Sequence, residues 1–204
     1  MKLYYSKGAC SLAVRILLHE LKLDCEYESV SLKEKKTASG LDYLTINPKG
    51  SVPALLLDNN KVLTENAVIQ QYLAETHHAN HLLPPVGDFT RYQVLELLNY
   101  ISTDIHKGFG PLFSPQLPEE MKKSFFIPLL KKRLLYLDQR LVGKKFLMGE
   151  QFTLADCYFF VMLFWTGIFP EIQLSEFPQL ERYFAALKTR EAIAAALKEE
   201  GLEA

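Results

Sequence analysis

The segment 47–73, in which a proline interrupts the approach to a hairpin, constrains the fold of this chain more than any other feature. The turn sequence NPKG opens it, and the step Val52-Pro53 then stands directly before an apolar run. Because proline has no N–H to donate to a sheet, it belongs at the start of a strand, on an edge or at a bulge. A cis bond at Pro53 would leave the backbone of Val52 free to meet a ligand.

A polar turn over residues 58–61 joins two short apolar runs, as in a hairpin. Apolar residues then recur at helical spacing, with Thr64 as the expected N-cap and Glu65 as an acid in the first turn. The hairpin would bring this helix start, with Glu65 and Asn66, close to the free backbone at Val52. Amide, carboxylate and carboxamide groups together suit the amino-acid end of a peptide-like ligand. The alternative is a hairpin packed on a helix with nothing bound.

Cys10 lies between the first expected strand, residues 2–6, and an apolar helix expected over 11–23. Unpaired N–H groups and the positive end of the helix dipole favour a thiolate at such a position. The alternative is that Cys10 is a small core residue. Position 13 is alanine, so the second thiol of a dithiol oxidoreductase is missing and any redox role would be monothiol.

The first eighty residues predict an α/β domain with a mixed sheet. A second strand is expected over 27–32, and the basic stretch 33–40 is expected to be a solvated loop or a short helix. A double proline within 77–87 marks the domain boundary, which gives domains 1–80 and 87–204. The three histidines of this linker have no partners at metal-ligand spacing, so we expect no metal site.

The second domain is helical throughout. A helix over 91–107 should end at Gly108, Gly110 and Pro111, with Asn99, Thr103 and His106 on one face towards a cleft.

Two further features concern folding in this domain. Pro128 should kink a helix over 121–142 near Ser124. Thr153 and Asp156 form a capping box that opens the apolar run to Trp165.

Charge and composition exclude several classes of protein. The net charge is −1, from 23 basic and 24 acidic residues, which argues against nucleic acid or an anionic membrane as the main partner. No apolar run has the length of a signal peptide core or a transmembrane helix. Three widely spaced cysteines make no disulfide framework. We therefore expect a cytoplasmic protein.

Four segments in order resemble the glutathione S-transferases, most closely the bacterial beta class: YYSKGACSLA, NPKGSVPALLL with TENAVIQQYL, LNYISTDIHKGFGPLF and FTLADCYF. The resemblance covers essentially the whole chain. It implies a thioredoxin-like N-terminal domain, an all-α C-terminal domain, glutathione as co-substrate without a metal, and a homodimer whose sites are completed at the subunit interface.

The resemblance also assigns roles to single residues. The Val52 backbone would pair with the cysteinyl part of glutathione, and Glu65 with Asn66 would hold the γ-glutamyl end. Cys10 matches the cysteine beside the glutathione sulfur, where it can form a mixed disulfide. The other matched positions are a basic residue near the glycyl carboxylate, Lys35, and a helix face lining the site, made by Asn99, Thr103, Asp104 and His106.

The chain departs from the family at Asn66, where many members carry serine. A carboxamide can still accept and donate hydrogen bonds. A generic member activates glutathione with tyrosine or serine, so Tyr5 and Ser11 rival Cys10 as activators. His106 is a further catalytic candidate.

The function implied is detoxification, by conjugation of glutathione to small hydrophobic electrophiles held in a cleft between the domains. Phe109, Phe113 and Trp165 are candidate apolar walls of that cleft. The alternatives are a monothiol glutathione-dependent thiol-disulfide oxidoreductase that uses Cys10, and a non-catalytic binding protein of the same fold.

Overall fold

The computed structural model describes residues 1–203 of the chain, which form two compact units. The first unit contains residues 1–79 together with the C-terminal segment from Thr189, and the second runs from Asn80 to Lys188. The sequence division had placed that C-terminal segment in the helical domain, whereas in the structure it packs with the first unit.

The first unit is built on a five-stranded sheet, whose mixed character was predicted. Its strands lie in the order β3-β2-β1-β4-β5. Strands β1 and β2 are parallel, and the other neighbours are antiparallel. The strands are β1 (Lys2–Tyr5), β2 (Glu26–Ser31), β3 (Lys36–Thr37), β4 (Ala54–Leu56) and β5 (Val62–Thr64).

Strand β3 corrects the prediction of a solvated loop or short helix over 33–40. Val30 and Ser31 of β2 pair with Thr37 and Lys36, and the Thr37 side chain is buried. A two-residue strand is too short to show the alternation that identifies strands from sequence.

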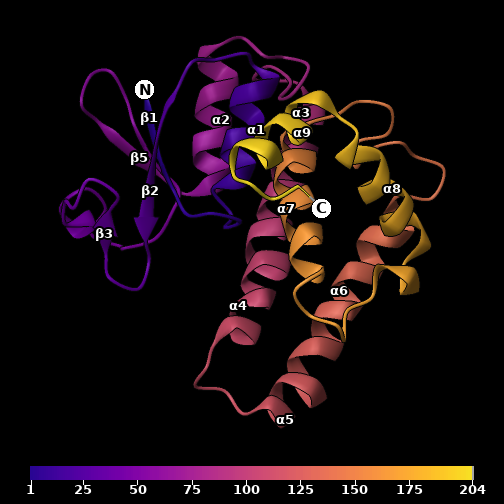
Figure 1. The fold of residues 1–204 in the computed structure, drawn as a ribbon. Helices are drawn as coiled ribbons and strands as arrows, with labels where there is room; N and C mark the ends of the chain where they lie inside the picture. The colour runs from indigo at the N-terminus through magenta and orange to yellow at the C-terminus, as the bar shows by residue number, and fades with distance from the viewer. Residues whose placement is uncertain (204) are drawn as a thin grey trace. The chain divides into compact units, whose positions relative to one another are not determined.

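Three helices belong to this unit: α1 (Leu12–Glu20), α2 (Asn66–Thr76) and α9 (Glu191–Glu199). A short 3-10 turn, η1 (Tyr43–Thr45), precedes β4. Every residue of α1 from Leu12 to Leu18 is buried, and α1 contacts both α2 and α9. Figure 1 shows α1 and α2 side by side.

The first helix of the second unit is longer than predicted. It runs through α3 (Phe89–Tyr100), the π-helical segment η2 (Ile101–His106) and α4 (Lys107–Phe113), so Gly108, Gly110 and Pro111 do not end it. Phe109 and Leu112 are buried, and this packing outweighs the unfavourable helix propensity of glycine and proline.

The predicted disturbance before Pro128 takes the form of a π-helical segment. The helix comprises α5 (Glu119–Met121), η3 (Lys122–Phe126) and α6 (Ile127–Arg140), with Pro128 in the first turn of α6. A wider turn accommodates the carbonyl groups that the proline ring leaves without a donor.

The core helix of the second unit is α7 (Leu154–Thr166), followed by η4 (Leu174–Glu176) and α8 (Pro178–Lys188). The capping box is confirmed, since the Thr153 backbone N–H donates to Asp156 Oδ2 at 2.7 Å. Tyr183 Oη also donates to Asp156, at 2.6 Å, although burial raises the pKa of this carboxyl. Within residues 1–203, none of the helices has the length and apolar character needed to cross a membrane.

Candidate active site

The Val52–Pro53 peptide bond is cis and lies directly before β4. The turn that leads to it is held from two sides, because Tyr43 Oη and Asn47 Nδ2 both donate to the Ser51 carbonyl, at 2.8 and 2.7 Å. Val52 is buried and its carbonyl accepts a hydrogen bond from Cys10 Sγ at 3.2 Å. The two positions identified from separate motifs therefore lie together.

Cys10 lies in the turn between β1 and α1, one residue before the N-cap Ser11, as predicted. The thiol is largely buried against Val52. The Cys10 carbonyl accepts two hydrogen bonds, from the Ala13 N–H at 3.1 Å and from Asn66 Nδ2 at 2.5 Å. Cys10 is thus fixed both through its side chain and through its backbone.

Glu65 occupies the N-cap position of α2, and this corrects the prediction that Thr64 caps the helix. Thr64 is the last residue of β5, where it pairs with Ala54. The backbone of Glu65 has φ of 73° and ψ of 121°, a conformation that residues other than glycine rarely adopt. Backbone strain of this kind is concentrated at functional sites, and sequence pattern alone could not reveal it.

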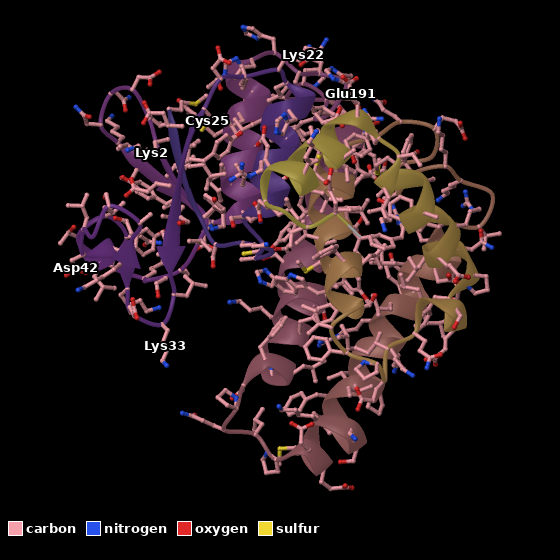
Figure 2. All side chains as sticks on the ribbon, viewed as in Figure 1. Lys2, Lys22, Cys25, Lys33, Asp42 and Glu191 are labelled. Atoms are coloured by element: carbon pink, nitrogen blue, oxygen red, sulfur yellow. The ribbon has the colours of Figure 1, made fainter. Side chains whose placement is uncertain are left out.

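Two lysines, Lys35 and Lys49, contact the turn before Val52 and the start of α2. Lys35 Nζ donates to the Gly50 carbonyl at 2.7 Å, and Lys49 Nζ forms an ion pair with Glu65. Lys33, by contrast, points outward from the first unit (Figure 2). Sequence reasoning missed Lys49, although the NPKG turn beside Val52 was the signal that could have identified it.

The two rival activators have structural partners of their own. Ser11 is fully buried, and its hydroxyl accepts a hydrogen bond from the Ser6 N–H at 3.3 Å. The Tyr5 ring lies 4.4 Å from the guanidinium carbon of Arg15 and meets Tyr27 edge to face.

The loop that carries Cys10 is also anchored from the C-terminus. Glu200 accepts from the Gly8 N–H at 2.7 Å and from Arg15 Nε at 3.1 Å. The Glu200 side chain is fully buried, and burial raises the pKa of its carboxyl. This contact spans 192 residues of sequence, so local motifs could not have revealed it.

The residues of the predicted polar face in the second unit differ in their exposure to solvent. Asn99 and Thr103 are exposed, whereas His106 is half-buried against α7, with Nδ1 2.6 Å from Tyr158 Oη. Thr103, Asp104 and His106 all lie in η2, where i→i+5 bonding shifts the angular spacing of side chains. Asp104 forms an ion pair with Arg133 at 3.2 Å.

Two of the three side chains predicted to line the electrophile cleft are buried in the second unit. Phe109 and Trp165 are buried and pack edge to face, with ring centroids 5.6 Å apart. His106 packs on the same Trp165 ring at 5.1 Å. Phe113 alone of the three predicted walls is exposed, at 47%.

A separate hollow of about 820 Å³ lies in the first unit between the end of α1, the start of β2 and α9. Its lining carries both signs of charge, with Lys22, Glu191 and the thiol of Cys25 labelled in Figure 2. Burial raises the pKa of the Cys25 thiol, which fits a structural role. Within the described residues, no group of three or more His, Cys, Asp or Glu side chains could hold a metal ion.

Comparison with known families matches both parts of the chain. Residues 1–75 match the model described as "Glutathione S-transferase, N-terminal domain", and residues 101–191 match "Glutathione S-transferase, C-terminal domain". Glutathione S-transferase GstA of Escherichia coli O157:H7 is 42% identical over 203 residues, which cover 100% of each chain.

Solved structures agree. A sphingomonad glutathione S-transferase complexed with glutathione is 41% identical, with a TM-score of 0.93 over 100% of each chain. A bacterial beta class glutathione S-transferase of Sphingomonas chungbukensis is 39% identical, with a TM-score of 0.94 over 100% of each chain. The chain therefore belongs to the glutathione S-transferase family, and the resemblance to its bacterial beta class is confirmed.

Proposed function

We propose that this protein conjugates the thiol of glutathione to small hydrophobic electrophiles, as a cytoplasmic detoxification enzyme that works as a homodimer. The observation that carries the proposal is the convergence of the Cys10 thiol on the Val52 carbonyl, at 3.2 Å, in a unit whose α2 begins with Glu65 and Asn66. The family relationship supports it.

Each binding role follows from chemistry that the residues present. The Val52 backbone would pair with the cysteinyl peptide group of glutathione, and the Glu65 carboxylate with the α-ammonium group. Glu65 is paired with the Lys49 ammonium, a charge of the same sign as that ligand group. Lys35 would attract the glycyl carboxylate.

The first chemical step is the loss of the glutathione thiol proton to solvent. The positive end of the α1 dipole would favour the thiolate. The thiolate sulfur then attacks the electrophilic carbon, a carbon–sulfur bond forms, and the leaving group departs with the electrons of its bond. Tyr5 and Ser11 remain alternative donors to the thiolate.

In the second unit we assign Asn99, Thr103, Asp104 and His106 to glutathione binding, with some contacts made by the partner subunit. Asp104 and His106 are held in place by Arg133 and Tyr158 respectively. The exposed ring of Phe113 offers apolar surface for the electrophile.

A second candidate is a monothiol oxidoreductase, favoured by the position of the Cys10 thiol beside Val52. In that reaction the Cys10 thiolate attacks one sulfur of a disulfide containing glutathione. A Cys10–glutathione disulfide forms and the other thiolate leaves.

The test is a steady-state assay of the wild-type chain and Cys10→Ala with glutathione and 1-chloro-2,4-dinitrobenzene, in parallel with a disulfide-reduction assay. Conjugation that survives in Cys10→Ala, within about tenfold, supports the transferase. Disulfide reduction that greatly exceeds conjugation and vanishes in Cys10→Ala favours the oxidoreductase. Absence of both activities, with glutathione still bound, would leave a non-catalytic binding protein.

A further inference from the structure

Asn66 was expected to hold the γ-glutamyl end of glutathione, but its side chain is directed inward. Its Nδ2 donates to the Cys10 carbonyl at 2.5 Å, and its Oδ1 accepts from Gln70 Nε2 at 2.7 Å. Asn66 is 6% exposed and Gln70 is fully buried. Both ends of the carboxamide are therefore engaged within the protein.

Gln70 supports the direction of the Asn66 amide, which the Cys10 carbonyl also requires because it can only accept a hydrogen bond. Gln70 lies one helical turn after Asn66 in α2, so the two side chains share a face of the helix. Because Gln70 donates to Asn66 Oδ1, the donor end of the carboxamide is left facing Cys10. A reversed amide would set two oxygens against each other at the Cys10 carbonyl.

The result is that Cys10 is held at two points by different elements. Asn66 of α2 fixes its carbonyl, and the Val52 carbonyl before β4 receives its thiol. A serine at position 66 would end one bond short of the carboxamide nitrogen and would not reach the Cys10 carbonyl without backbone movement. The asparagine is therefore suited to this contact.

We propose that Asn66, oriented by Gln70, is a positioning residue that fixes Cys10 beside the Val52 carbonyl, and that its side chain is not a direct ligand of glutathione. Glutathione would then meet the start of α2 through Glu65 and the free backbone N–H groups of the first turn. The consequence for catalysis rests on the proposed function, whereas the effect on Cys10 itself does not.

The test uses four forms of the full chain: wild type, Asn66→Ser, Gln70→Met and the control Gln71→Met. Gln71 is the same residue type in the same helix, but its side chain donates only to the Ala67 carbonyl, at 3.2 Å. Methionine keeps the length and helix propensity of glutamine and removes its hydrogen bonds. Circular dichroism melting shows that each variant is folded.

The first readout is the rate at which Cys10 forms a mixed disulfide with glutathione disulfide, followed by peptide mass spectrometry. The Cys10 sulfur bonds to one glutathione sulfur and the other glutathione leaves as the thiolate. We expect the maximal rate constant to fall about fivefold in Asn66→Ser and Gln70→Met, the effect of one net hydrogen bond. The half-saturating concentration should stay within about twofold, and Gln71→Met should match wild type.

The second readout is alkylation of Cys10 by iodoacetamide in the protein without glutathione. Loss of the Asn66 contact with the Cys10 carbonyl should accelerate alkylation about fivefold in Asn66→Ser and Gln70→Met, and not in Gln71→Met.

A raised half-saturating concentration in Asn66→Ser alone, with an unchanged maximal rate and unchanged alkylation, would overturn the proposal and make Asn66 a direct ligand. If wild type forms no adduct with glutathione disulfide, the oxidoreductase reaction fails on its own, and the conjugation reaction is not affected. Alkylation then decides the positioning role, and equal rates in all four forms would overturn it.

Discussion

At the scale of single residues, Glu65 combines a strained backbone with an exposed carboxylate. Its φ of 73° suits glycine better than any residue with a Cβ atom, yet its side chain reaches solvent and pairs with Lys49. A conformation of this kind persists where the surrounding structure holds it. At Glu65 those surroundings are the end of β5 and the first turn of α2, both fixed by their own hydrogen bonds.

Two substitutions of Glu65 separate the backbone from the carboxylate. Glu65→Gly and Glu65→Ala both delete the carboxylate and differ only in the Cβ atom. We expect the glycine variant to have a free energy of unfolding higher than the alanine variant by about 1 kcal/mol, because glycine adopts positive φ without strain. Urea denaturation measures the difference, and equal stabilities would show that the backbone is relaxed at Glu65.

Glu28 connects stability to pH. Hydrogen bonds, led by that from Ser39 Oγ at 2.5 Å, lower the pKa of this carboxyl to about 2. A carboxyl whose pKa is lower in the folded state stabilises the fold above its unfolded value of about 4.5. That contribution is lost as the pH falls from about 4.5 to about 2.

Glu28→Gln should therefore lower the free energy of unfolding at pH 7 by about 1 kcal/mol, with the deficit shrinking below pH 4.5. Denaturant titrations at several pH values measure it. Glu26→Gln is the control, since the Glu26 side chain is 77% exposed and lies 3.5 Å from Lys2. A deficit that stayed constant with pH would mean that the charge of Glu28 has no part in it.

The residues of the candidate site differ in how far sequence could identify them. Cys10 and Val52 carry strong local signals, a helix start and a proline that blocks a strand, and the structure brings them together. Asn66 was found, but its side-chain direction depends on Gln70, a contact that no motif encodes. The partners of Glu200 lie at the opposite end of the chain, beyond the reach of any local pattern.

At the scale of the elements, helix α4 shows why two glycines in one helix can differ. A Cβ atom on Gly108 would lie 3.1 Å from Leu130 Cδ1 and 3.2 Å from an Arg133 nitrogen, whereas one on Gly110 would meet nothing within 4 Å. Gly108 is buried and Gly110 is exposed. The first glycine permits close helix packing, and the second has no such role.

Gly108→Ala should lower the free energy of unfolding by about 1 kcal/mol through overpacking. Gly110→Ala should raise it by up to about 1 kcal/mol, because alanine has the higher helix propensity. Thermal melts of the pair, whose substitutions are chemically identical, measure the contrast. Shifts of the same sign for both would show that α6 moves freely to accept a methyl group.

Helix α9 belongs energetically with the Cys10 loop. Its end supplies Glu199 and Glu200 to the buried Arg15, at 2.8 and 3.1 Å. Removal of Glu200 would take away the buried carboxylate partner of Arg15 and leave its guanidinium paired with the exposed Glu199. Glu200→Ala should lower the free energy of unfolding by about 3 kcal/mol.

Glu203→Ala is the matched control, because Glu203 is exposed three residues further along. Its effect should stay within about 0.5 kcal/mol. Chemical denaturation compares the two variants. Equal stability of both would mean that the Arg15 cluster does not anchor the C-terminal helix.

Element types were predictable where periodicity was long, as in α1 and α7, whose apolar residues fill several turns. The C-terminal end of the first long helix of the second unit was not predictable, because Gly108, Gly110 and Pro111 have low helix propensity. Burial of Phe109 overrides them, and propensity carries no information on such tertiary contacts. The π-helical segments were not predicted either, because the periodicity of apolar residues does not distinguish them from the α-helix around them.

At the scale of the whole molecule, the match to the glutathione S-transferase family spans both units and essentially every residue. A ligand that binds only the folded state stabilises it in proportion to the logarithm of its concentration. Glutathione at 100 times its Kd should therefore add about 2.7 kcal/mol and raise the Tm by roughly 5 to 10 °C.

Differential scanning fluorimetry measures this shift, and Glu65→Gln should reduce it at the same glutathione concentration. Cysteinylglycine lacks the γ-glutamyl group, so its smaller shift should be the same for both proteins. An equal shift of both proteins with glutathione would remove Glu65 from the binding site.

The most direct test of the account is mass spectrometry of the intact native protein after incubation with glutathione disulfide, with and without reductant, beside Cys10→Ala. The account predicts one glutathione adduct per chain, reversed by reductant and absent from Cys10→Ala. It would be contradicted by an adduct that persists in Cys10→Ala, or by the absence of any adduct together with no retention on immobilised glutathione.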